Sequence, residues 1–244
     1  NTVLALFSDR DHTIWAALDN GISNIRTHTP LSFFEPAENQ IGPVEDILFE
    51  DNRLYLATNQ GVYSYSAIDR KLSTIPGFDI QSWFIKSFGK QIFVGHNQGT
   101  SLLRNLQEIR VVGPHAGGTD MKRAIVNNKD VLLESSYPSL YVYTQDLSGN
   151  WSFNHAVEGF SDLIKNLEID HAGNIWAGHM YKGVYRLKLD GDLRKVIEKD
   201  LFLSFDTTQV SSFRPIKVMK LKGRIIFADG ERFFTYDDIG HKIV

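Results

Sequence analysis

The sequence predicts an all-β protein, a β-propeller built from about six four-stranded blades. One observation is a repeat of short strands and tight turns that recurs about six times along the 244 residues. Another is the period, since the second strands begin 40, 38, 39, 44 and 50 residues apart, at Ile14, Leu54, Ile92, Val131, Ile175 and Ile225. The sequence also contains no long amphipathic helix. A blade cannot bury its apolar faces alone, so the repeat predicts blades packed radially around a central axis.

The first three copies of the repeat are regular. Copy one predicts strands at 3–9, 14–17 and 22–26, with an outer strand at 31–34. Copy two predicts strands at 44–49, 54–57 and 62–65, and copy three at 83–88, 92–95, 101–103 and 109–112. The turn before each third strand ends in glycine after Asn or Gln (Asn20-Gly21, Gln60-Gly61, Gln98-Gly99), and glycine tolerates the positive φ of tight hairpins.

The last three copies are less uniform. Copy four predicts strands at 121–126, 131–133, 140–143 and 151–153, but Tyr137-Pro138-Ser139 replaces its turn glycine. Copy five predicts 164–169, 175–177, 183–187 and 193–197, and copy six 216–221, 225–227, 233–236 and 243–244. The lead-in at 202–214 is the least regular part. The predicted domain is a single propeller over 1–244, with blades at about 1–36, 42–76, 80–114, 120–155, 162–198 and 212–244.

Composition excludes several functional classes. Lys and Arg total 26 against 29 Asp and Glu, a net charge of −3, so no basic excess predicts a nucleic-acid partner. The absence of cysteine excludes disulfides, thiol catalysis and thiolate metal sites. No apolar run reaches the roughly 18 residues of a membrane span, and no signal peptide is visible. Because a strand pattern already begins at Val3, we expect a piece of a longer chain, with any membrane contact made by its other parts.

The sequence contains no recognisable catalytic, metal or cofactor motif. The eight histidines include no pair at close metal-ligand spacing, and there is no nucleophile elbow, phosphate loop or dinucleotide fingerprint. Asp9, Glu50 and Asp170 share one repeat position, where capping of a turn is a sufficient role. We therefore expect no catalytic residues, no metal and no cofactor.

Candidate ligand-binding residues lie at the turns between second and third strands, which gather on one face of a propeller. His96 and His179 hold equivalent places after the second strand, where a polar strand end or a ligand contact both fit. Turn formation does not require Tyr137, Tyr181 or Lys182, so these are the better candidates. Together the five predict a polar, aromatic-flanked patch for a sugar or a partner loop. We expect Trp15, Tyr55, Phe93 and Trp176, which share one repeat position, to pack between blades.

One family pattern is visible in these repeats. Asp170-His171-Ala172-Gly173-Asn174-Ile175-Trp176-Ala177-Gly178, followed by Gly183-Val184-Tyr185, resembles the two-component regulator propeller repeat. Residues 54–63 match its second half, and residues 14–22 match more loosely. Copy four departs by lacking the glycines, and copy six by lacking the second-strand aromatic.

The resemblance implies a periplasmic sensor region of a hybrid two-component system, as in gut Bacteroidetes, where such repeats detect glycan fragments. That family commonly has seven blades and often two propellers, followed by a β-sandwich, a membrane helix and a kinase. The chain is then either a six-bladed propeller or a fragment of a seven-bladed or double propeller. The implied partners are an oligosaccharide or another small polar ligand, further domains of the same receptor, and a second copy in a homodimer.

Three functional classes remain open, because a propeller fold by itself does not choose among them. A non-enzymatic sensor would bind an oligosaccharide and relay the event to a membrane-linked kinase. A protein-interaction scaffold is the first alternative, although the Gly-His and Trp-Asp marks of WD repeats are absent. A propeller enzyme of the quinoprotein or lyase type is the second, and the four tryptophans are few for a regular quinoprotein repeat.

Overall fold

The structure, a computed structural model, describes residues 2–26, 41–66, 68–69, 71–113, 116–126, 128–203 and 216–244. These residues form strands, turns and loops and no helix, so the predicted all-β class is confirmed. The chain divides into two compact units, residues 1–40 and 41–244, and each is described by itself. The prediction of one propeller domain over the whole chain stays a prediction.

The first unit contains one antiparallel sheet, blade 1. Its three described strands are β1 (Val3–Ser8), β2 (Thr13–Leu18) and β3 (Gly21–Arg26), paired in that order. The outer strand predicted at 31–34 lies outside the described residues.

The second unit contains five four-stranded antiparallel blades, each a meander in chain order. Blade 2 is β4 (Val44–Glu50), β5 (Arg53–Thr58), β6 (Gly61–Ser66) and β7 (Lys71–Thr74). Blade 3 is β8 (Ser82–Phe88), β9 (Gln91–His96), β10 (Gly99–Arg104) and β11 (Gln107–Val111). Blade 4 is β12 (Gly118–Val126), β13 (Lys129–Ser136), β14 (Leu140–Gln145) and β15 (Trp151–Ala156). Blade 5 is β16 (Ile164–Ile169), β17 (Ile175–His179), β18 (Val184–Leu189) and β19 (Val196–Phe202). Blade 6 is β20 (Lys217–Leu221), β21 (Arg224–Ala228), β22 (Phe233–Asp237) and β23 (Lys242–Ile243).

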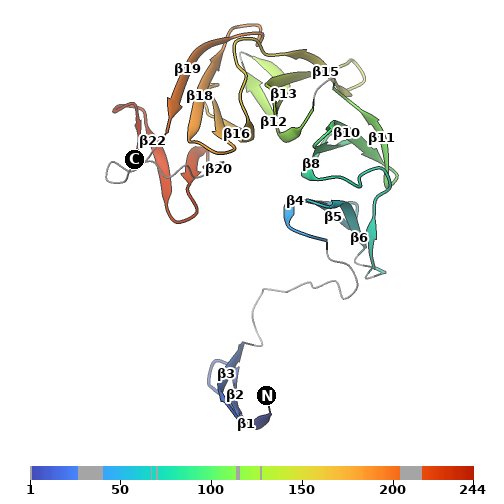
Figure 1. Ribbon diagram of the computed structural model, residues 1–244, viewed down its shortest axis with the longest axis vertical. Coiled ribbons are helices and arrows are strands. Elements are labelled where there is room, and N and C mark those ends of the chain that lie inside the picture. The colour runs from blue at the N-terminus through green and yellow to red at the C-terminus, as the bar shows by residue number, and fades with distance from the viewer. Residues whose placement is uncertain are drawn as a thin grey trace. The chain divides into compact units, whose positions relative to one another are not determined.

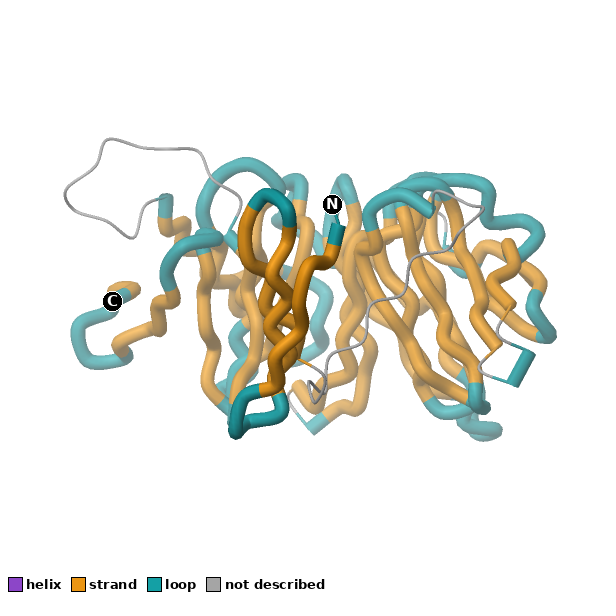
Figure 2. Tube along the Cα trace, turned by 90° about the horizontal axis from the view of Figure 1, so that it is seen from below, coloured by secondary structure: helices purple, strands orange, loops and turns teal. Residues whose placement is uncertain are grey.

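Successive blades of this unit stand side by side, in the manner of a β-propeller. The first strands β4, β8, β12, β16 and β20 contact one another in that order, and the later strands of each blade lie outward (Figure 1). The connecting turns gather at the two ends of the strands (Figure 2). We call the end with the second-to-third-strand turns the upper face, and the end with the first-to-second and third-to-fourth turns the lower face.

Each pair of neighbouring blades in the second unit encloses its own hydrophobic core. The first such core joins Tyr55 and Val62 of blade 2 to Val94 of blade 3. The other cores lie between blades 3 and 4, 4 and 5, and 5 and 6. Apolar faces that one sheet leaves open are therefore covered by the next sheet, which is the packing that the repeat predicts.

The shared aromatic position of the repeat is buried in three of its four copies. Tyr55, Phe93 and Trp176 are buried and contribute to cores between blades, as predicted. The Phe93 ring lies 6.1 Å from Tyr143 of the next blade, and the Trp176 ring 5.1 Å from Phe227. Trp15 lies in the first unit, where it is 41% exposed, and its packing against another blade stays a prediction.

A register shift interrupts the first strand of blades 1 to 5. In blades 2 to 5 it skips Glu45, Trp83, Thr119 and Lys165, which have no partner in the antiparallel ladder. The next residue joins the blades in three cases, because its side chain accepts a backbone N–H from the first strand of the following blade. Asp46 accepts from Ile85 at 3.1 Å, Asp120 from Leu167 at 3.0 Å and Asn166 from Val218 at 2.8 Å. These bonds fix one blade against the next.

The outer strand of blade 5 lies later in the chain than predicted. The sequence pattern places it at 193–197, whereas β19 spans Val196–Phe202. The reason is a turn at Asp190, whose carboxylate accepts the Arg194 N–H at 2.8 Å. Leu193 in this turn has a φ of 60° and a buried side chain, so it belongs to the core and not to the strand. Most of the predicted irregular segment, residues 204–214, lies outside the described residues.

Candidate functional site

The candidate site begins with the bulges of the first strands. A bulge turns one side chain out of the strand's alternation, and bulges are frequent next to binding sites. In blades 2, 3 and 5 the skipped residues are Glu45, Trp83 and Lys165. In blade 4 it is Thr119, whose hydroxyl instead donates to the Ile164 carbonyl of blade 5 at 2.7 Å. Three of the four bulges thus provide charged or aromatic groups.

Trp83 belongs to a hydrogen-bonded triangle with side chains from two upper-face turns. The Trp83 indole N–H is 2.9 Å from Asn97 Oδ1 and 3.0 Å from the Tyr137 hydroxyl. That hydroxyl donates to Asn97 Oδ1 at 2.6 Å. Asn97 lies between β9 and β10, and Tyr137 between β13 and β14, so the triangle joins blades 3 and 4.

Two further bulge residues extend the triangle toward blades 2 and 5. The Lys165 ammonium lies 5.5 Å from the centroid of the Trp83 ring, a cation–π distance. It also lies 3.6 Å from a carboxylate oxygen of Glu45. We call Glu45, Trp83, Asn97, Tyr137 and Lys165 the upper-face cluster. Its members come from four blades, and its two charges offset each other.

The upper turn of blade 5 is organised by His179. Its Nδ1 accepts the backbone N–H groups of Tyr181 and Lys182 at 2.9 and 3.0 Å. Because Nδ1 accepts, the proton of the neutral ring is on Nε2, which donates to Asp162 at 2.9 Å. His179 is 4% exposed, so its imidazole supports the turn from inside the blade.

The Asp162 carboxylate accepts several hydrogen bonds beneath this turn. It accepts from the Tyr185 hydroxyl at 2.5 Å and the Leu163 N–H at 2.9 Å, and the Lys182 ammonium lies at 3.3 Å. Partial burial alone would raise the pKa of the Asp162 carboxyl, but the bonds from Tyr185, Leu163 and His179 lower it well below its ordinary value. Burial, followed by the bond to Asp162, raises the pKa of Tyr185 to about 12.

His96 plays the same part in blade 3 with different partners. Its Nδ1 accepts the Gln98 N–H at 3.3 Å, and its Nε2 is 2.8 Å from the Ser101 hydroxyl, which in turn donates to Glu108. The ring is 2% exposed, and burial lowers the pKa of its imidazole. In both blades the histidine after the second strand is a buried partner of the turn.

The five predicted ligand residues thus occupy two kinds of place. Tyr137 lies in the upper-face cluster, Tyr181 is 60% exposed at its own turn, and Lys182 is partly exposed. Burial raises the pKa of the Tyr137 hydroxyl, whereas its hydrogen bond with Trp83 lowers it. His96 and His179 lie beneath the surface instead.

Sequence reasoning missed Glu45, Trp83, Asn97 and Lys165 as site residues. In the sequence, turn formation is a sufficient role for Asn97, and the other three residues fall within predicted strands. The sequence does contain a signal for these bulges. Glu45, Trp83 and Lys165 are followed directly by Asp46, Phe84 and Asn166. A polar or aromatic residue directly after the bulge residue interrupts the alternation of an otherwise half-buried strand.

The chemistry available on the upper face is recognition by aromatic rings and hydrogen bonds. Indole, phenol and amide groups offer both ring faces and hydrogen-bonding atoms, while a lysine and a carboxylate supply one charge of each sign. Among the described residues, no group of three or more His, Cys, Asp and Glu side chains is arranged to hold a metal ion.

The fold resembles solved propeller structures. Two crystal structures of an extracellular domain from Bacteroides thetaiotaomicron have TM-scores of 0.63 and 0.58; the first is described as part of a putative one-component system and the second as part of a putative hybrid two-component system. Their sequence identities are 14% and 15%, and the alignments cover 100% and 95% of this chain. They cover 36% and 37% of those structures, so the chain spans about a third of their length.

An enzyme shares the fold as well. Virginiamycin B lyase from Staphylococcus aureus has a TM-score of 0.55 at 10% identity, over 84% of this chain and 70% of the lyase. No protein-family model and no curated protein sequence matches this chain. The structural likenesses confirm the β-propeller fold. No helix in the described part of the chain has the length and hydrophobicity to cross a membrane.

Proposed function

We propose that this chain is a non-enzymatic, ligand-binding propeller of a two-component signalling receptor, located in the periplasm. It recognises an oligosaccharide on its upper face and relays binding, through further domains of the receptor, to a membrane-linked kinase. The repeat pattern resembles that receptor family, and a structure that the chain resembles is described as the extracellular domain of such a system.

The observation that carries the ligand part of the proposal is the triangle of Trp83, Asn97 and Tyr137. A sugar presents apolar ring faces and hydroxyls that both donate and accept, and the triangle offers two aromatic rings beside an amide. Residues of blades 3 and 4 form it, so a ligand lying there would contact two blades at once.

The test is calorimetry against a panel of plant and host oligosaccharides. Tyr137→Ala and Tyr181→Ala should each weaken binding without abolishing it, since one aromatic platform contributes on the order of 1 kcal/mol, or about fivefold in Kd. Tyr137→Phe keeps the ring and removes the hydroxyl bond to Asn97, which separates stacking from hydrogen bonding.

The matched control is Leu147→Ala, because Leu147 is fully exposed in the β14–β15 turn on the lower face. It should bind as the parent does. If the panel contains a ligand that both tyrosine variants bind as tightly as the parent, the upper-face proposal is wrong. Release of a cleaved product from any panel member would instead identify an enzyme, the alternative that the lyase resemblance keeps open.

A further inference from the structure

The turn that carries Asn97 rests on an unprotonated nitrogen of a buried histidine. The backbone nitrogen of Gln98 lies 3.3 Å from His96 Nδ1, and because a backbone N–H can only donate, Nδ1 must accept. The proton of the neutral ring is therefore on Nε2, which donates to the Ser101 hydroxyl at 2.8 Å, and that hydroxyl donates to Glu108. An imidazolium ring has a donor on both nitrogens and no acceptor, so a protonated His96 cannot accept from Gln98.

Blade 2 forms the same turn with a supporting side chain that does not titrate. Its residues are Thr58-Asn59-Gln60-Gly61, and those of blade 3 are His96-Asn97-Gln98-Gly99, so the two turns differ only at the supporting residue. The Thr58 hydroxyl accepts the backbone N–H two residues further on at 3.1 Å, as His96 Nδ1 does. A hydroxyl accepts whatever the pH, whereas an imidazole loses its acceptor on protonation. The turn itself does not require a histidine, and the histidine makes the turn of blade 3 sensitive to protons.

Asn97 depends on this turn for its place in the upper-face cluster. Its Oδ1 accepts from the Trp83 indole at 2.9 Å and from the Tyr137 hydroxyl at 2.6 Å. Because an indole N–H can only donate, the oxygen of the amide must face the triangle. Both bonds require that oxygen at one point in space, and the backbone of the turn decides where the point lies. A change in the turn therefore takes an acceptor away from Trp83.

The surroundings of His96 favour its neutral form at neutral pH. The ring is buried, with the Phe78 ring 6.1 Å away in an edge-on arrangement, and burial lowers the pKa of the imidazole below its ordinary value of 6.5. Two carboxylates face the ring, Glu108 from β11 and Glu134 from β13, and both act in the opposite direction by raising the pKa. Burial has the larger effect, so we expect the ring to take up its proton only in acid solution.

We propose that His96 makes the upper-face site dependent on pH: the ligand binds while the ring is neutral, and protonation moves the turn of Asn97 and weakens binding. His96 is thus a positioning residue, which acts through Asn97 and does not touch the ligand itself. The effect on binding rests on the proposed function, whereas the movement of the turn is a property of the free protein, so the two are tested separately.

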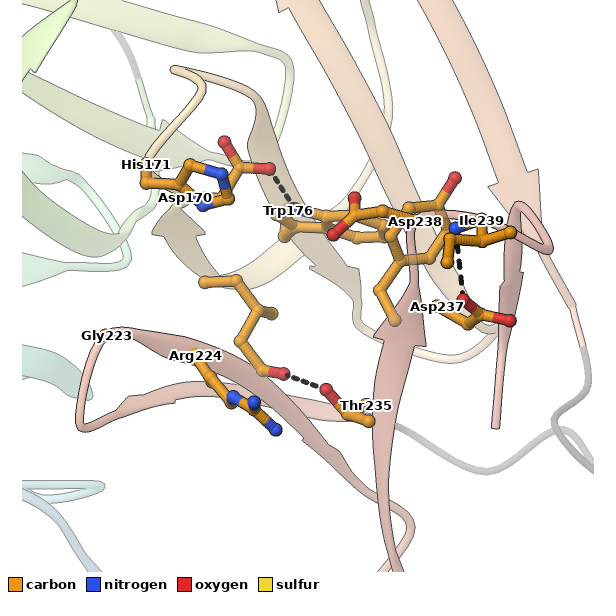
Figure 3. A pocket seen from close by; sticks show the side chains of 11 residues that line it. Asp170, His171, Trp176, Gly223, Arg224, Thr235, Asp237, Asp238 and Ile239 are labelled. Atoms are coloured by element: carbon orange, nitrogen blue, oxygen red, sulfur yellow. Dashed lines mark hydrogen bonds between the residues drawn. The ribbon is translucent and has the colours of Figure 1, made fainter.

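The Trp83 indole provides a test that needs no ligand. Its N–H resonance in two-dimensional ¹⁵N–¹H NMR spectra, assigned with Trp83→Phe, should move between about pH 7.5 and 4.5 in a one-proton transition that coincides with the titration of the His96 ring. His96→Thr, which copies the turn of blade 2, should abolish this transition. The Trp176 indole, which donates to Asp170 in blade 5 (Figure 3), is the internal control, and His96→Thr should leave its resonance in place.

The effect on binding is measured by calorimetry with maltotriose and cellotriose, which carry no ionisable group. For a trisaccharide that binds at about pH 7.5, Kd for the parent should rise about threefold or more by about pH 4.5, and by no more than about tenfold per pH unit, the limit for one proton. In His96→Thr the Kd should stay within about twofold over the same range, because the threonine does not titrate.

The inference is overturned if His96 titrates and the Trp83 resonance does not follow it, or if His96→Thr keeps the transition. It is also overturned if the His96 ring takes up no proton above about pH 4.5, or if Kd for the parent does not change while the ring titrates. If neither trisaccharide binds at neutral pH, that result counts against the proposed function for these ligands, and the NMR titration still decides the proton effect. Should His96→Thr fail to fold, the titration of the parent decides alone.

Discussion

Blades 1 and 5 share a hydrogen bond between a turn aspartate and a tryptophan of the second strand, but the two tryptophans are buried to different extents. In blade 1 the Trp15 indole donates to Asp9 at 2.8 Å, and in blade 5 the Trp176 indole donates to Asp170 at 2.9 Å. In both, the carboxylate also accepts two backbone N–H groups of the turn between first and second strands. Trp176 is 1% exposed against the core with blade 6, whereas Trp15 is 41% exposed. The hydrogen bonds follow from the repeat, and the burial of Trp176 follows from its packing on blade 6.

The largest expected difference between the two blades is in the free energy of unfolding after removal of the indole. Trp176→Ala should lower it by about 3–5 kcal/mol, because the ring packs on Phe202, Phe227 and Tyr236. Trp15→Ala should cost about 1 kcal/mol or less, as expected for a partly exposed side chain. Urea unfolding followed by far-UV circular dichroism measures both, and equal losses would show that Trp15 also packs against another blade.

The next effect separates the hydrogen bond from the packing. Asp170→Ala leaves the buried Trp176 N–H without its partner and should cost about 1–3 kcal/mol. Asp9→Ala should cost less, because water can replace the carboxylate beside an exposed indole. Thermal unfolding of both variants and of Asp146→Ala, where the carboxylate caps an exposed turn, provides the comparison. A Tm loss for Asp9→Ala as large as that for Asp170→Ala would contradict the role given to burial.

The third effect is the pH dependence contributed by the Asp162–Tyr185 hydrogen bond of blade 5. The pKa of Tyr185 is raised in the folded protein, to about 12, so its contribution is present at neutral pH and is lost as pH rises from about 10 to 12. This loss should be about 1–2 kcal/mol and should be absent in Tyr185→Phe. The pKa of Asp162 is lowered, so its contribution is present above the ordinary value of 3.8 and is lost as pH falls through and below it.

Unfolding free energies measured by urea titration between about pH 2 and 12 test both arms. Asp162→Asn should reduce the acid arm and also reduce the alkaline arm, because the hydrogen bond to Asp162 and its charge both help to raise the pKa of Tyr185, whereas the part caused by burial remains. If both variants keep the pH profile of the parent, the Asp162–Tyr185 bond contributes nothing to the stability of blade 5.

The smallest expected effect is that of an exposed ion pair on the outer part of blade 5. Lys188 lies 2.8 Å from Glu198, and both side chains are at least half exposed. Lys188→Ala should change the free energy of unfolding by no more than about 0.5 kcal/mol, since solvent and salt screen such pairs. A change above about 1 kcal/mol by the same measurement would mean that the pair belongs to a larger network.

Much of the fold followed from the sequence because its signals are local. Strands and turns were predicted from residues a few positions apart, namely the periodic second strands, the hairpin glycines and the turn-capping aspartates. The structure has a second strand at each predicted position, which are Ile14, Leu54, Ile92, Val131, Ile175 and Ile225. The outer strand of blade 5 was misplaced because the turn at Asp190 has no pattern shared with the other copies.

The candidate site depended on tertiary structure. The sequence predicts Tyr137 as a ligand residue because its turn does not need it, and that role stays a prediction. Its hydrogen-bond partners Trp83 and Asn97 lie 54 and 40 residues away in the chain. The sequence alone determined where strands and turns form, since hydrogen bonds between close residues decide that. Only the packing of one blade on the next decided which side chains are buried and which ones meet, because those contacts join residues that no local pattern relates.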